Sequence, residues 1–385
     1  MIPYGRQSIS DADIDSVVDV LRSDFLTQGP VVPRFEEAVS TTVGASFGVA
    51  VNSATSALHI GCLALGVGPG DVVWTSPNTF VASANCARYC GAEVDFVDID
   101  PASYNMCASR LQEKLTQARV SGKLPKVVIP VHFAGQPCNM PEIHRLSIEF
   151  GFKILEDASH AIGASYSGFR VGSCAHSNIT VFSFHPVKII TTGEGGMAMT
   201  NDPKLAERMR RLRTHGITTD KSLMHARASG EIWNYQQLEL GFNYRMTDMQ
   251  AALGLSQLAR LDHFIAARRR IAETYNTQLE SLPISLPKEG SDLQSSYHLY
   301  SVRIPEQGGK AQRHVFNSLI ESGVAANLHY IPVHRHPYYE NLGFKPGIFP
   351  ESEQFHREAL SLPIYPELQP EQQRLVIDAL GDALA

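Results

Sequence analysis

The sequence predicts an α/β fold: a large, mostly parallel sheet with helices on both faces, followed by a smaller α+β domain. Short apolar runs alternate with helical stretches between residues 47 and 201. From residue 247 the pattern is helical, and it then changes to a shorter mixed segment. Apolar strands separated by helices are typical of a parallel sheet buried on both faces, and ligands of such sheets bind at the carboxyl ends of the strands.

Seven strands are expected in the large domain, each a short apolar run bounded by turn residues or by a helix. They are FGVAV (47–51), VVWTS (72–76), EVDFVDID (93–100), VVIPVHF (127–133), KILED (153–157), ITVFSF (179–184) and GGMAMTN (195–201). Helices are expected between them over residues 79–89 and 141–150.

The rest of the chain is expected to form a long helix and a small domain. Apolar residues recur at two- to four-residue steps over residues 247–282, and Pro283 and Pro287 close this segment. A strand-like run (297–304) and an amphipathic helix after Pro370 follow. The predicted units are therefore a large domain (1–246), a connecting helix (247–282) and a small α+β domain (283–385), against which the N-terminal segment is a candidate to pack.

The composition narrows the classes of function. The 385 residues are 43% hydrophobic and 19% charged, with a net charge of −6, which disfavours nucleic acid and anionic membranes as partners. The N-terminus lacks the basic start and apolar core of a signal peptide. No pair of the six cysteines has CxxC spacing, and a reduced, cytoplasmic compartment is expected. His132, His185, His329 and His334 show no recognised ligand spacing, so no metal is expected.

The segment VFSFHPVKIITTGEGGM (181–197) presents a lysine just past the end of a strand. Pro186 interrupts the strand, and Lys188 follows on a loop from which its amine can reach the crevice where cofactors bind. Apolar and glycine-rich neighbours suit an amine of lowered pKa, and only the neutral amine attacks an aldehyde. Taken alone, Lys188 is also explained as an exposed lysine at a loop end, which is the commoner case.

The segment EDASHAIG (156–163) brings Glu156 and Asp157 to the carboxyl end of another strand. A carboxylate there can pair with a protonated ring nitrogen and make the ring an electron sink. Asp157 can equally cap the next turn. His160 can stack on a cofactor or hydrogen-bond to it, or it can be an ordinary buried histidine.

Two further segments follow strand ends. In VNSATSALHIG (51–61), backbone N–H groups and hydroxyls at a helix N-terminus suit a phosphate, although a Ser/Thr cap without ligand explains them as well. In TSPNTFVASANC (75–86), Phe80 can stack on an aromatic ring, although core packing is the commoner use of Phe.

The order of these features is more specific than any one of them. A phosphate-type turn, an aromatic residue, Asp157 and Lys188 follow one another at predicted strand ends of one parallel sheet, and Lys188 comes 31 positions after Asp157. This arrangement resembles the fold-type-I pyridoxal-phosphate enzymes.

Along nearly its whole length the chain resembles the DegT/StrS-type sugar aminotransferases. The matching segments are LTQGPVVPRFEEAV (26–39), NSATSAL (52–58), SPNTFVASAN (76–85), VHFAGQPCNM (131–140), EDASHAIGA (156–164), SFHPVKIITTGEGG (183–196) and GFNYRMTDMQAALGLSQL (241–258). The resemblance implies a fold-type-I architecture, pyridoxal 5′-phosphate as cofactor, a nucleotide-linked keto-sugar as substrate and an amino donor such as L-glutamate. NSATSAL, the Ser-His after Asp157 and the SFHxxK run resemble most the branch that aminates UDP-4-keto-6-deoxy-N-acetyl-L-altrosamine on the route to pseudaminic acid.

Carried over by position, the resemblance implies a role for each candidate residue. Lys188 would be the Schiff-base lysine and proton shuttle, and Asp157 would bind the pyridine nitrogen. The other cofactor contacts would be Ala54, Thr55 and Ser183 at the phosphate, Phe80 stacked on the ring, His160 near the ring hydroxyl, and Asn243 reaching the phosphate from the neighbouring subunit of a homodimer. Thr27, Gln28, His329 and Tyr330 would face the substrate. A Gln is frequent in relatives at the position of His160, and this departure favours the altrosamine branch.

Other functions are compatible with parts of this pattern. Aminotransferases that act at C3 of a dTDP-sugar, at C4 of another keto-sugar or on a scyllo-inosose-type cyclitol belong to the same family. Its dehydratase branch lacks the lysine, so Lys188 argues against that reaction. A regulatory or DNA-binding protein on this fold is disfavoured by the net charge, and the basic run RMRRLRTHG (208–216) fits a solvated helix face.

Overall fold

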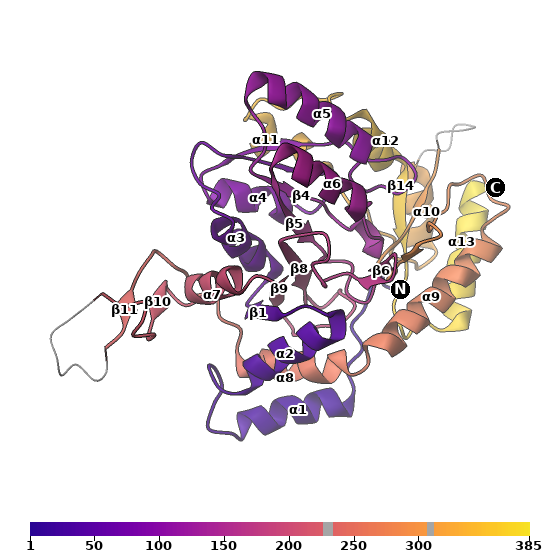
Figure 1. Cartoon of the computed structure of the whole chain (residues 1–385). Helices are drawn as coiled ribbons and strands as arrows, with labels where there is room; N and C mark the ends of the chain where they lie inside the picture. The colour runs from indigo at the N-terminus through magenta and orange to yellow at the C-terminus, as the bar shows by residue number, and fades with distance from the viewer. Residues whose placement is uncertain (226–233, 306–311) are drawn as a thin grey trace.

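A seven-stranded sheet forms the centre of the molecule (Figure 1). The structure is a computed structural model that describes residues 1–225, 234–305 and 312–385. The strand order is β1-β9-β8-β5-β4-β2-β3. The strands are β1 (Phe47–Val51), β2 (Val72–Thr75), β3 (Glu93–Phe96), β4 (Val127–Ile129), β5 (Lys153–Asp157), β8 (Ile179–Ser183) and β9 (Gly196–Thr200). Each of the seven strands expected over residues 47–201 is therefore confirmed, some of them shorter than expected.

One strand runs against the other six. β9 pairs antiparallel with both β1 and β8, whereas β8, β5, β4, β2 and β3 pair in parallel. Residues 184–195 join β8 to β9 without a helix, and a connection without a crossover helix returns the chain in the opposite direction. The sheet is thus mostly parallel, and the carboxyl ends of β1, β5 and β8 lie at the same edge.

Helices cover both faces of the sheet, as the alternation of buried side chains requires. Val49, Leu155 and Val181 face α3 (Ala54–Ala64), α4 (Ala82–Tyr89) and α7 (Pro203–Leu212) in one apolar cluster. Ala50 and Phe182 point to the other face, against α2 (Val31–Val43) and α8 (Asp248–Leu258). α5 (Ala108–Ser121) and α6 (Met140–Phe150) cover that same face beside β2 and β4.

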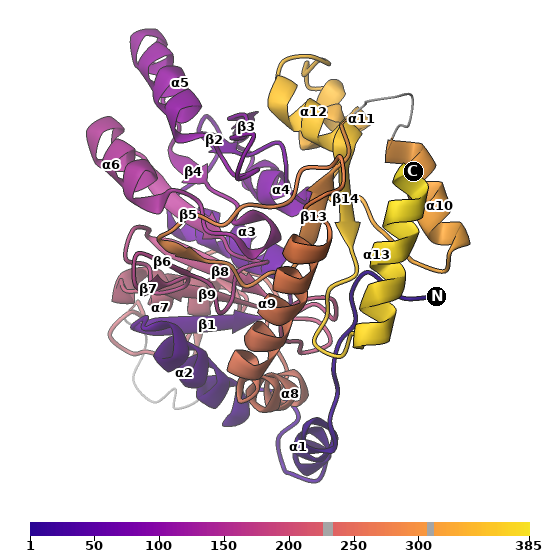
Figure 2. The same ribbon diagram turned by 90° about the vertical axis from the view of Figure 1, so that its right-hand side faces the viewer.

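The prediction of a single connecting helix over residues 247–282 is wrong. Two helices occupy this stretch, α8 (Asp248–Leu258) and α9 (Leu261–Gln278), separated by a turn at Ala259 and Arg260. α8 packs between α1 (Asp11–Leu21) and α2, whereas α9 leads to the C-terminal elements (Figure 2). Packing on two different partners overrides the continuous helical pattern of the sequence.

A second apolar core lies toward the C-terminus. α9 packs there with β13 (Tyr300–Arg303), β14 (Ala359–Leu362), α10 (Gln312–Glu321) and α13 (Pro370–Leu384). Ile2 belongs to this cluster, and its N–H donates to Gly323 O (2.8 Å). The first residues of the chain therefore pack against the C-terminal region. The ring of Tyr4 lies 5.3 Å, between centroids, from that of His329 in the loop that follows α10. α11 (Pro337–Glu340) and α12 (Pro350–Glu358) precede β14 in the chain, and both lie near the top of Figure 2.

An arm extends from the body beyond α7 (Figure 1). It carries β10 (Ile217–Thr218) and β11 (Gln236–Gln237), which pair antiparallel.

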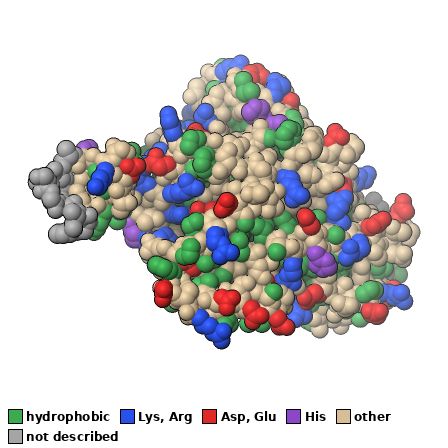
Figure 3. All heavy atoms as spheres, turned by 60° about the horizontal axis from the view of Figure 1, so that its bottom comes forward, with side chains coloured by type: hydrophobic (Ala, Val, Ile, Leu, Met, Phe, Trp, Pro, Cys, Tyr) green, Lys and Arg blue, Asp and Glu red, His purple; other side chains and the backbone are tan. Residues whose placement is uncertain are grey.

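Basic and acidic side chains are interspersed on the face of the molecule that Figure 3 shows. The remaining strands form one small sheet: β6 (Ser165–Tyr166), β7 (Phe169–Arg170) and β12 (Leu293–Gln294). Within the described ranges, no helix combines the length and the apolar character needed to cross a bilayer.

Candidate active site

A cavity of about 700 Å³ opens at the carboxyl ends of β1, β5 and β8. The sheet contributes the strand ends and the loops after them, and the C-terminal region closes the cavity with His298 and residues 327–330. Nine of the residues proposed from the sequence line it: Ala54, Thr55, Phe80, Asp157, His160, Ser183, Lys188, His329 and Tyr330. Side chains from distant parts of the chain thus meet in one space.

Three proposed residues lie elsewhere. Thr27 and Gln28 are exposed, and Thr27 pairs with Thr247 at the start of α8. Asn243 is exposed on the segment that leads back from the arm, and it pairs with Thr214. A contact of Asn243 with a neighbouring subunit stays a prediction, since the structure contains one chain.

Lys188 lies on the loop that follows β8, with its side chain partly buried in the cavity. Its backbone N–H donates to His185 O (2.9 Å), and within the described residues its Nζ makes no hydrogen bond. Burial lowers the pKa of the amine from its usual 10.5 to about 8, and the charge of Asp157 opposes part of this shift. The amine is therefore available as a nucleophile and a base much closer to neutral pH than an exposed lysine.

Asp157 is the last residue of β5 and is buried, 4% exposed. Its Oδ2 accepts a hydrogen bond from Ser83 Oγ (2.6 Å), and its Oδ1 accepts one from the Ser159 N–H (3.1 Å). Ser83 in turn contacts Thr79 Oγ1 (2.8 Å). These contacts orient the carboxylate toward the cavity, and the bond to Ser159 shows that Asp157 also caps the following turn.

The start of α3 forms the part of the cavity suited to an anion. Ser53 is the N-cap, and its Oγ accepts from the Ser56 N–H (3.1 Å). The N–H groups of Ala54 and Thr55 lie in the first turn, where no helical acceptor exists, and they have none among the described residues. A Cβ on Gly196 would lie 2.5 Å from Ala54 N, so only glycine allows β9 to approach this turn so closely.

Two aromatic residues, Phe80 and Tyr330, also line the cavity. Phe80 lines the cavity with 59% of its side chain exposed, an unusual position for Phe unless a flat group covers it. Its ring centroid lies 6.2 Å from that of Tyr330, and Tyr330 Oη contacts His160 Nε2 (3.1 Å). The alternative that Phe80 is a core residue is therefore wrong.

His160, His298 and His329 all line the cavity, and the pKa of each is lowered so that the neutral imidazole is favoured. Burial, together with Lys188 and His329, holds the pKa of His160 well below its usual value. Burial is also the main cause of the low pKa of His298, and it lowers that of His329 to about 3. The rings of His160 and His298 lie 4.4 Å apart between centroids. The cavity thus holds Lys188 beside neutral hydrogen-bonding groups.

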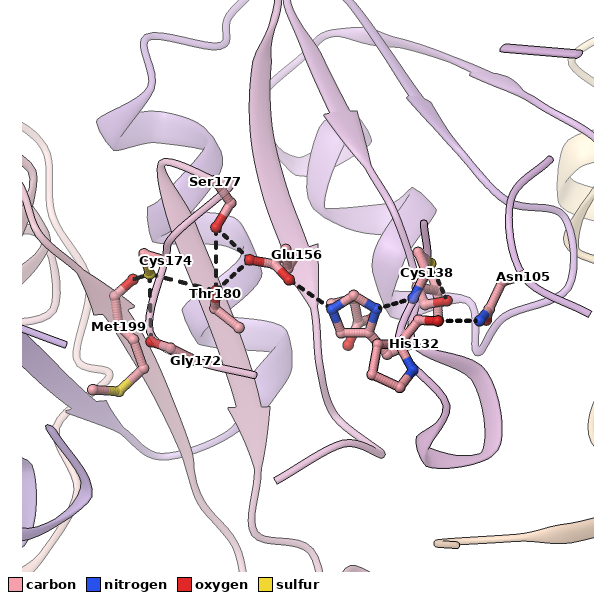
Figure 4. Close-up of polar contacts among 12 residues, drawn as sticks. Asn105, His132, Cys138, Glu156, Gly172, Cys174, Ser177, Thr180 and Met199 are labelled. Atoms are coloured by element: carbon pink, nitrogen blue, oxygen red, sulfur yellow. Dashed lines mark hydrogen bonds and ion pairs between the residues drawn. The ribbon is translucent and has the colours of Figure 1, made fainter. Parts of the chain in front are cut away.

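Glu156 does not accompany Asp157 into the cavity, although both were expected at the strand end. Successive side chains of a strand point to opposite faces, so Glu156 points away and binds His132, Ser177 and Thr180 (Figure 4).

Residues that sequence reasoning missed include Tyr4 and His298, which line the cavity, and Ser83, which binds Asp157. Ser83 lies in the first turn of α4, and its contact with Asp157 depends on how that helix packs. Tyr4 and His298 belong to segments whose position over the sheet follows from the packing of the C-terminal region, and no local pattern indicates that.

The donor set fits a phosphorylated pyridine aldehyde. The free N–H groups of Ala54 and Thr55 suit the phosphate, and the exposed ring of Phe80 suits a flat ring. The buried carboxylate of Asp157 suits a protonated ring nitrogen, and the amine of Lys188 suits the aldehyde. The residues present therefore match the cofactor implied by the resemblance.

Comparison with known proteins gives a consistent result. The model of the DegT/DnrJ/EryC1/StrS aminotransferase family matches residues 7–381. The spore coat polysaccharide biosynthesis protein SpsC of Bacillus subtilis is 37% identical over 99% of this chain and 96% of its own. The UDP-4-amino-4,6-dideoxy-N-acetyl-beta-L-altrosamine transaminase of Campylobacter jejuni is 34% identical over 100% of this chain and 98% of its own. Among solved structures, the PMP form of Spr1654 from Streptococcus pneumoniae has a TM-score of 0.90 at 29% identity, covering 100% of this chain and 99% of that one.

Proposed function

Because the chain belongs to the DegT/DnrJ/EryC1/StrS aminotransferase family, we propose that it transfers an amino group from L-glutamate to carbon 4 of a UDP-linked 4-keto sugar. The chain is a pyridoxal-phosphate-dependent sugar aminotransferase. The finer proposal is that the acceptor is UDP-2-acetamido-2,6-dideoxy-L-arabino-hex-4-ulose. Its product would be UDP-4-amino-4,6-dideoxy-N-acetyl-L-altrosamine, a precursor of pseudaminic acid.

One observation carries the proposal: Lys188, Asp157 and the first turn of α3 converge on a single cavity. A lysine amine of lowered pKa, a buried carboxylate and an anion-binding turn are the three groups that a pyridoxal-phosphate enzyme needs. They come from the ends of three different strands, β8, β5 and β1, which makes a chance arrangement improbable.

The roles of the residues follow from their positions. Pyridoxal phosphate, when bound, supplies an electron sink for the pair left behind when a proton leaves the carbon next to the reacting nitrogen. Lys188 Nζ takes that proton and returns it to the neighbouring carbon, and its pKa near 8 suits both directions of transfer. Asp157 keeps the ring nitrogen protonated, because its buried carboxylate favours a partner cation.

The remaining groups bind and orient. The N–H groups of Ala54 and Thr55, with Ser183, hold the phosphate, and Phe80 covers one face of the ring. His160, His329 and Tyr330 line the same cavity, where His160 would meet the ring hydroxyl and the other two would face the sugar from the C-terminal region. The side chains of both halves of the molecule are thus needed for one reaction.

Two arguments support the UDP-sugar over other acceptors. The Campylobacter relative, named for the altrosamine product, matches this chain end to end. The histidine at position 160 also favours that branch. SpsC is of similar identity and is named for spore coat polysaccharide, so an experiment must separate this acceptor from other keto-sugars.

We also propose that the active unit is a homodimer. Asn243 is exposed, lies outside the cavity of its own chain and follows the protruding arm, which suits a contact with a neighbouring cavity. The dimer would then complete the phosphate site of each subunit.

Transfer of labelled nitrogen tests the proposed reaction. The purified protein is incubated with pyridoxal phosphate, ¹⁵N-glutamate and the UDP-4-keto sugar, and the sugar product is weighed by mass spectrometry. We expect an amino sugar that carries ¹⁵N, and no such product from dTDP-3-keto sugars offered in the same way. Labelled product from the dTDP-3-keto sugar alone would replace the acceptor in the proposal.

A further inference from the structure

A buried polar network joins Glu156, whose side chain does not line the cavity, to the loop 132–138 (Figure 4). The Glu156 carboxylate accepts hydrogen bonds from Ser177 Oγ and from Thr180 Oγ1 (2.8 Å). On its other side it contacts His132 Nε2 (2.6 Å). Burial raises the pKa of Glu156, but the bonds from His132, Ser177 and Thr180 outweigh burial and lower it overall, so the group is an ionised acceptor.

His132 is the link between this carboxylate and the loop. It is fully buried, and its Nδ1 accepts a hydrogen bond from the Cys138 N–H (3.1 Å). A backbone N–H can only donate, so Nδ1 carries no proton and Nε2–H donates to Glu156. Burial lowers the pKa of His132 while Cys138 and Glu156 raise it, to about 10. A second proton on Nδ1 would, however, face the Cys138 N–H, so the hydrogen-bond geometry selects the neutral ring.

The loop is held at further points. Asn105 Oδ1 accepts from the Phe133 N–H (2.9 Å), and Asn105 Nδ2 donates to Gln136 O (2.9 Å). Gly135 has a φ of +95°, and a Cβ there would lie 2.3 Å from Ser296 Oγ. Glycine at position 135 therefore allows the loop to approach the backbone of His160 and His298 closely.

This conformation brings a backbone donor to a cavity residue. The Ala134 N–H donates to His160 Nδ1 (3.3 Å), and His160 Nε2 contacts Tyr330 Oη (3.1 Å). By the same reasoning as for His132, Nδ1 of His160 carries no proton. The ring therefore has its proton on Nε2, the nitrogen that points toward Tyr330 and the cavity.

We propose that Glu156 and His132 are positioning residues: they hold the loop 132–138 so that the Ala134 N–H keeps His160 in its neutral Nε2–H tautomer. His160 then presents Nε2–H to Tyr330 Oη on the cavity side (3.1 Å). If the proton moved to Nδ1, Nε2 would become an acceptor and the Ala134 N–H would lose its partner. The inference rests on the proposed function only for the cofactor that this donor would meet.

Nuclear magnetic resonance of the full chain with ¹⁵N-labelled imidazoles tests the proposal without cofactor. The His160 signals are assigned by their absence from a His160→Gln sample. The key variant is His132→Gln, which keeps a donor for Glu156 but removes the acceptor for the Cys138 N–H. The matched control is Thr180→Val, which removes a bond to the same carboxylate on the side away from the loop.

We expect one Nε2–H tautomer of His160 in the unmodified chain and in Thr180→Val, and a mixture of tautomers in His132→Gln. Glu156→Gln, which weakens the bond that orients His132, should produce the same change to a smaller extent and serves if His132→Gln does not fold. A proton on Nδ1 of His160 in the unmodified chain overturns the proposal. So does an unchanged His160 in both loop variants, or an equal change in Thr180→Val, which would mark a general loss of stability.

A second readout uses pyridoxal phosphate as the probe. The pH at which the absorbance band of the loaded chain changes should shift in His132→Gln and stay unchanged in Thr180→Val. If the chain forms no band at all, the proposed function fails while the tautomer result stands by itself. If the band forms but its pH midpoint is the same in all three proteins, the positioning role of the network fails and the aminotransferase does not.

Discussion

At the scale of single residues, the chemistry depends on the amine of Lys188. Its pKa of about 8 results from burial on the loop that follows β8, and the charge of Asp157 opposes part of this lowering. The same nitrogen would bind the cofactor and move the proton, so no neighbouring group can replace it.

Replacement of Lys188 by Ala should therefore abolish transamination. We expect a fall in turnover of more than about 10⁴-fold, the upper range for a positioned acid–base group, because attachment and proton transfer are lost together. Steady-state assays with glutamate and the keto-sugar measure this. Lys153→Ala, at the exposed start of β5, is the control and should retain full activity. Appreciable turnover by Lys188→Ala without added amines would contradict the assignment.

The pH dependence of cofactor attachment follows from the same shift. A lysine amine with its pKa lowered to about 8 is neutral for roughly a tenth of the time at pH 7, against about one part in three thousand at the ordinary value. The rate at which the apo chain becomes yellow after pyridoxal phosphate is added should rise with pH and level off above about pH 8. A rate that still rises steeply toward pH 10 would mean that the amine is not desolvated.

The sequence predicts some of these residues well and others not at all. Asp157 ends one strand and Lys188 follows the end of another, where the chain direction alone brings them to the ligand edge of the sheet. Ser83 orients Asp157 from a neighbouring helix, and the pairing depends on how α4 packs. His298 comes from the far end of the chain, so its contact with the site is tertiary and leaves no local signal.

At the scale of elements, the first turn of α3 depends on its fit against β9. Gly196 pairs with Ser183 of β8, and a side chain there would collide with the backbone of Ser53 and Ala54. The first turn of α3 can therefore take this position only because residue 196 of β9 is a glycine, which has no side chain.

Gly196→Ala should displace this turn and weaken cofactor binding without touching Lys188. We expect the Kd for pyridoxal phosphate to rise by at least about tenfold, equivalent to ~1.4 kcal/mol, in an absorbance titration. Gly381→Ala is the control, because a Cβ there meets nothing within 4 Å and alanine suits the interior of α13. Equal affinities in the two variants would show that the turn does not hold the phosphate.

Element boundaries show where sequence patterns reach their limit. The strands at 47–51 and 153–157 are found as expected, because a run of apolar residues between turns has few other uses. The antiparallel direction of β9 and the break between α8 and α9 depend on which partner each segment packs against. Periodicity indicates a helix but not the point at which it changes direction.

At the scale of the whole molecule, the protruding arm exposes apolar side chains that would suit a partner surface. Leu240 and Tyr235 on the arm are 78% and 61% exposed, more than large apolar side chains usually are. A neighbouring subunit would cover them and would bring Asn243 to the second cavity.

Leu240→Glu should weaken the proposed dimer, because burial of an unpaired carboxylate in an interface is unfavourable. Light scattering after gel filtration should give a mass near twice 42.3 kDa for the unmodified protein and a lower mass for the variant, with weaker binding of pyridoxal phosphate. Val120→Glu, on an exposed site of α5 away from the arm, is the control. A monomer that binds the cofactor with undiminished affinity would contradict the shared site.

The most direct test of the central claim is an absorbance spectrum of the purified protein before and after glutamate, followed by addition of the UDP-4-keto-6-deoxy sugar. We predict a yellow band that collapses with glutamate and returns with the keto-sugar, which would establish both half-reactions on this chain. A band that collapses but does not return would leave the aminotransferase intact and remove this acceptor. The absence of any band after addition of pyridoxal phosphate would contradict the role of Lys188 itself.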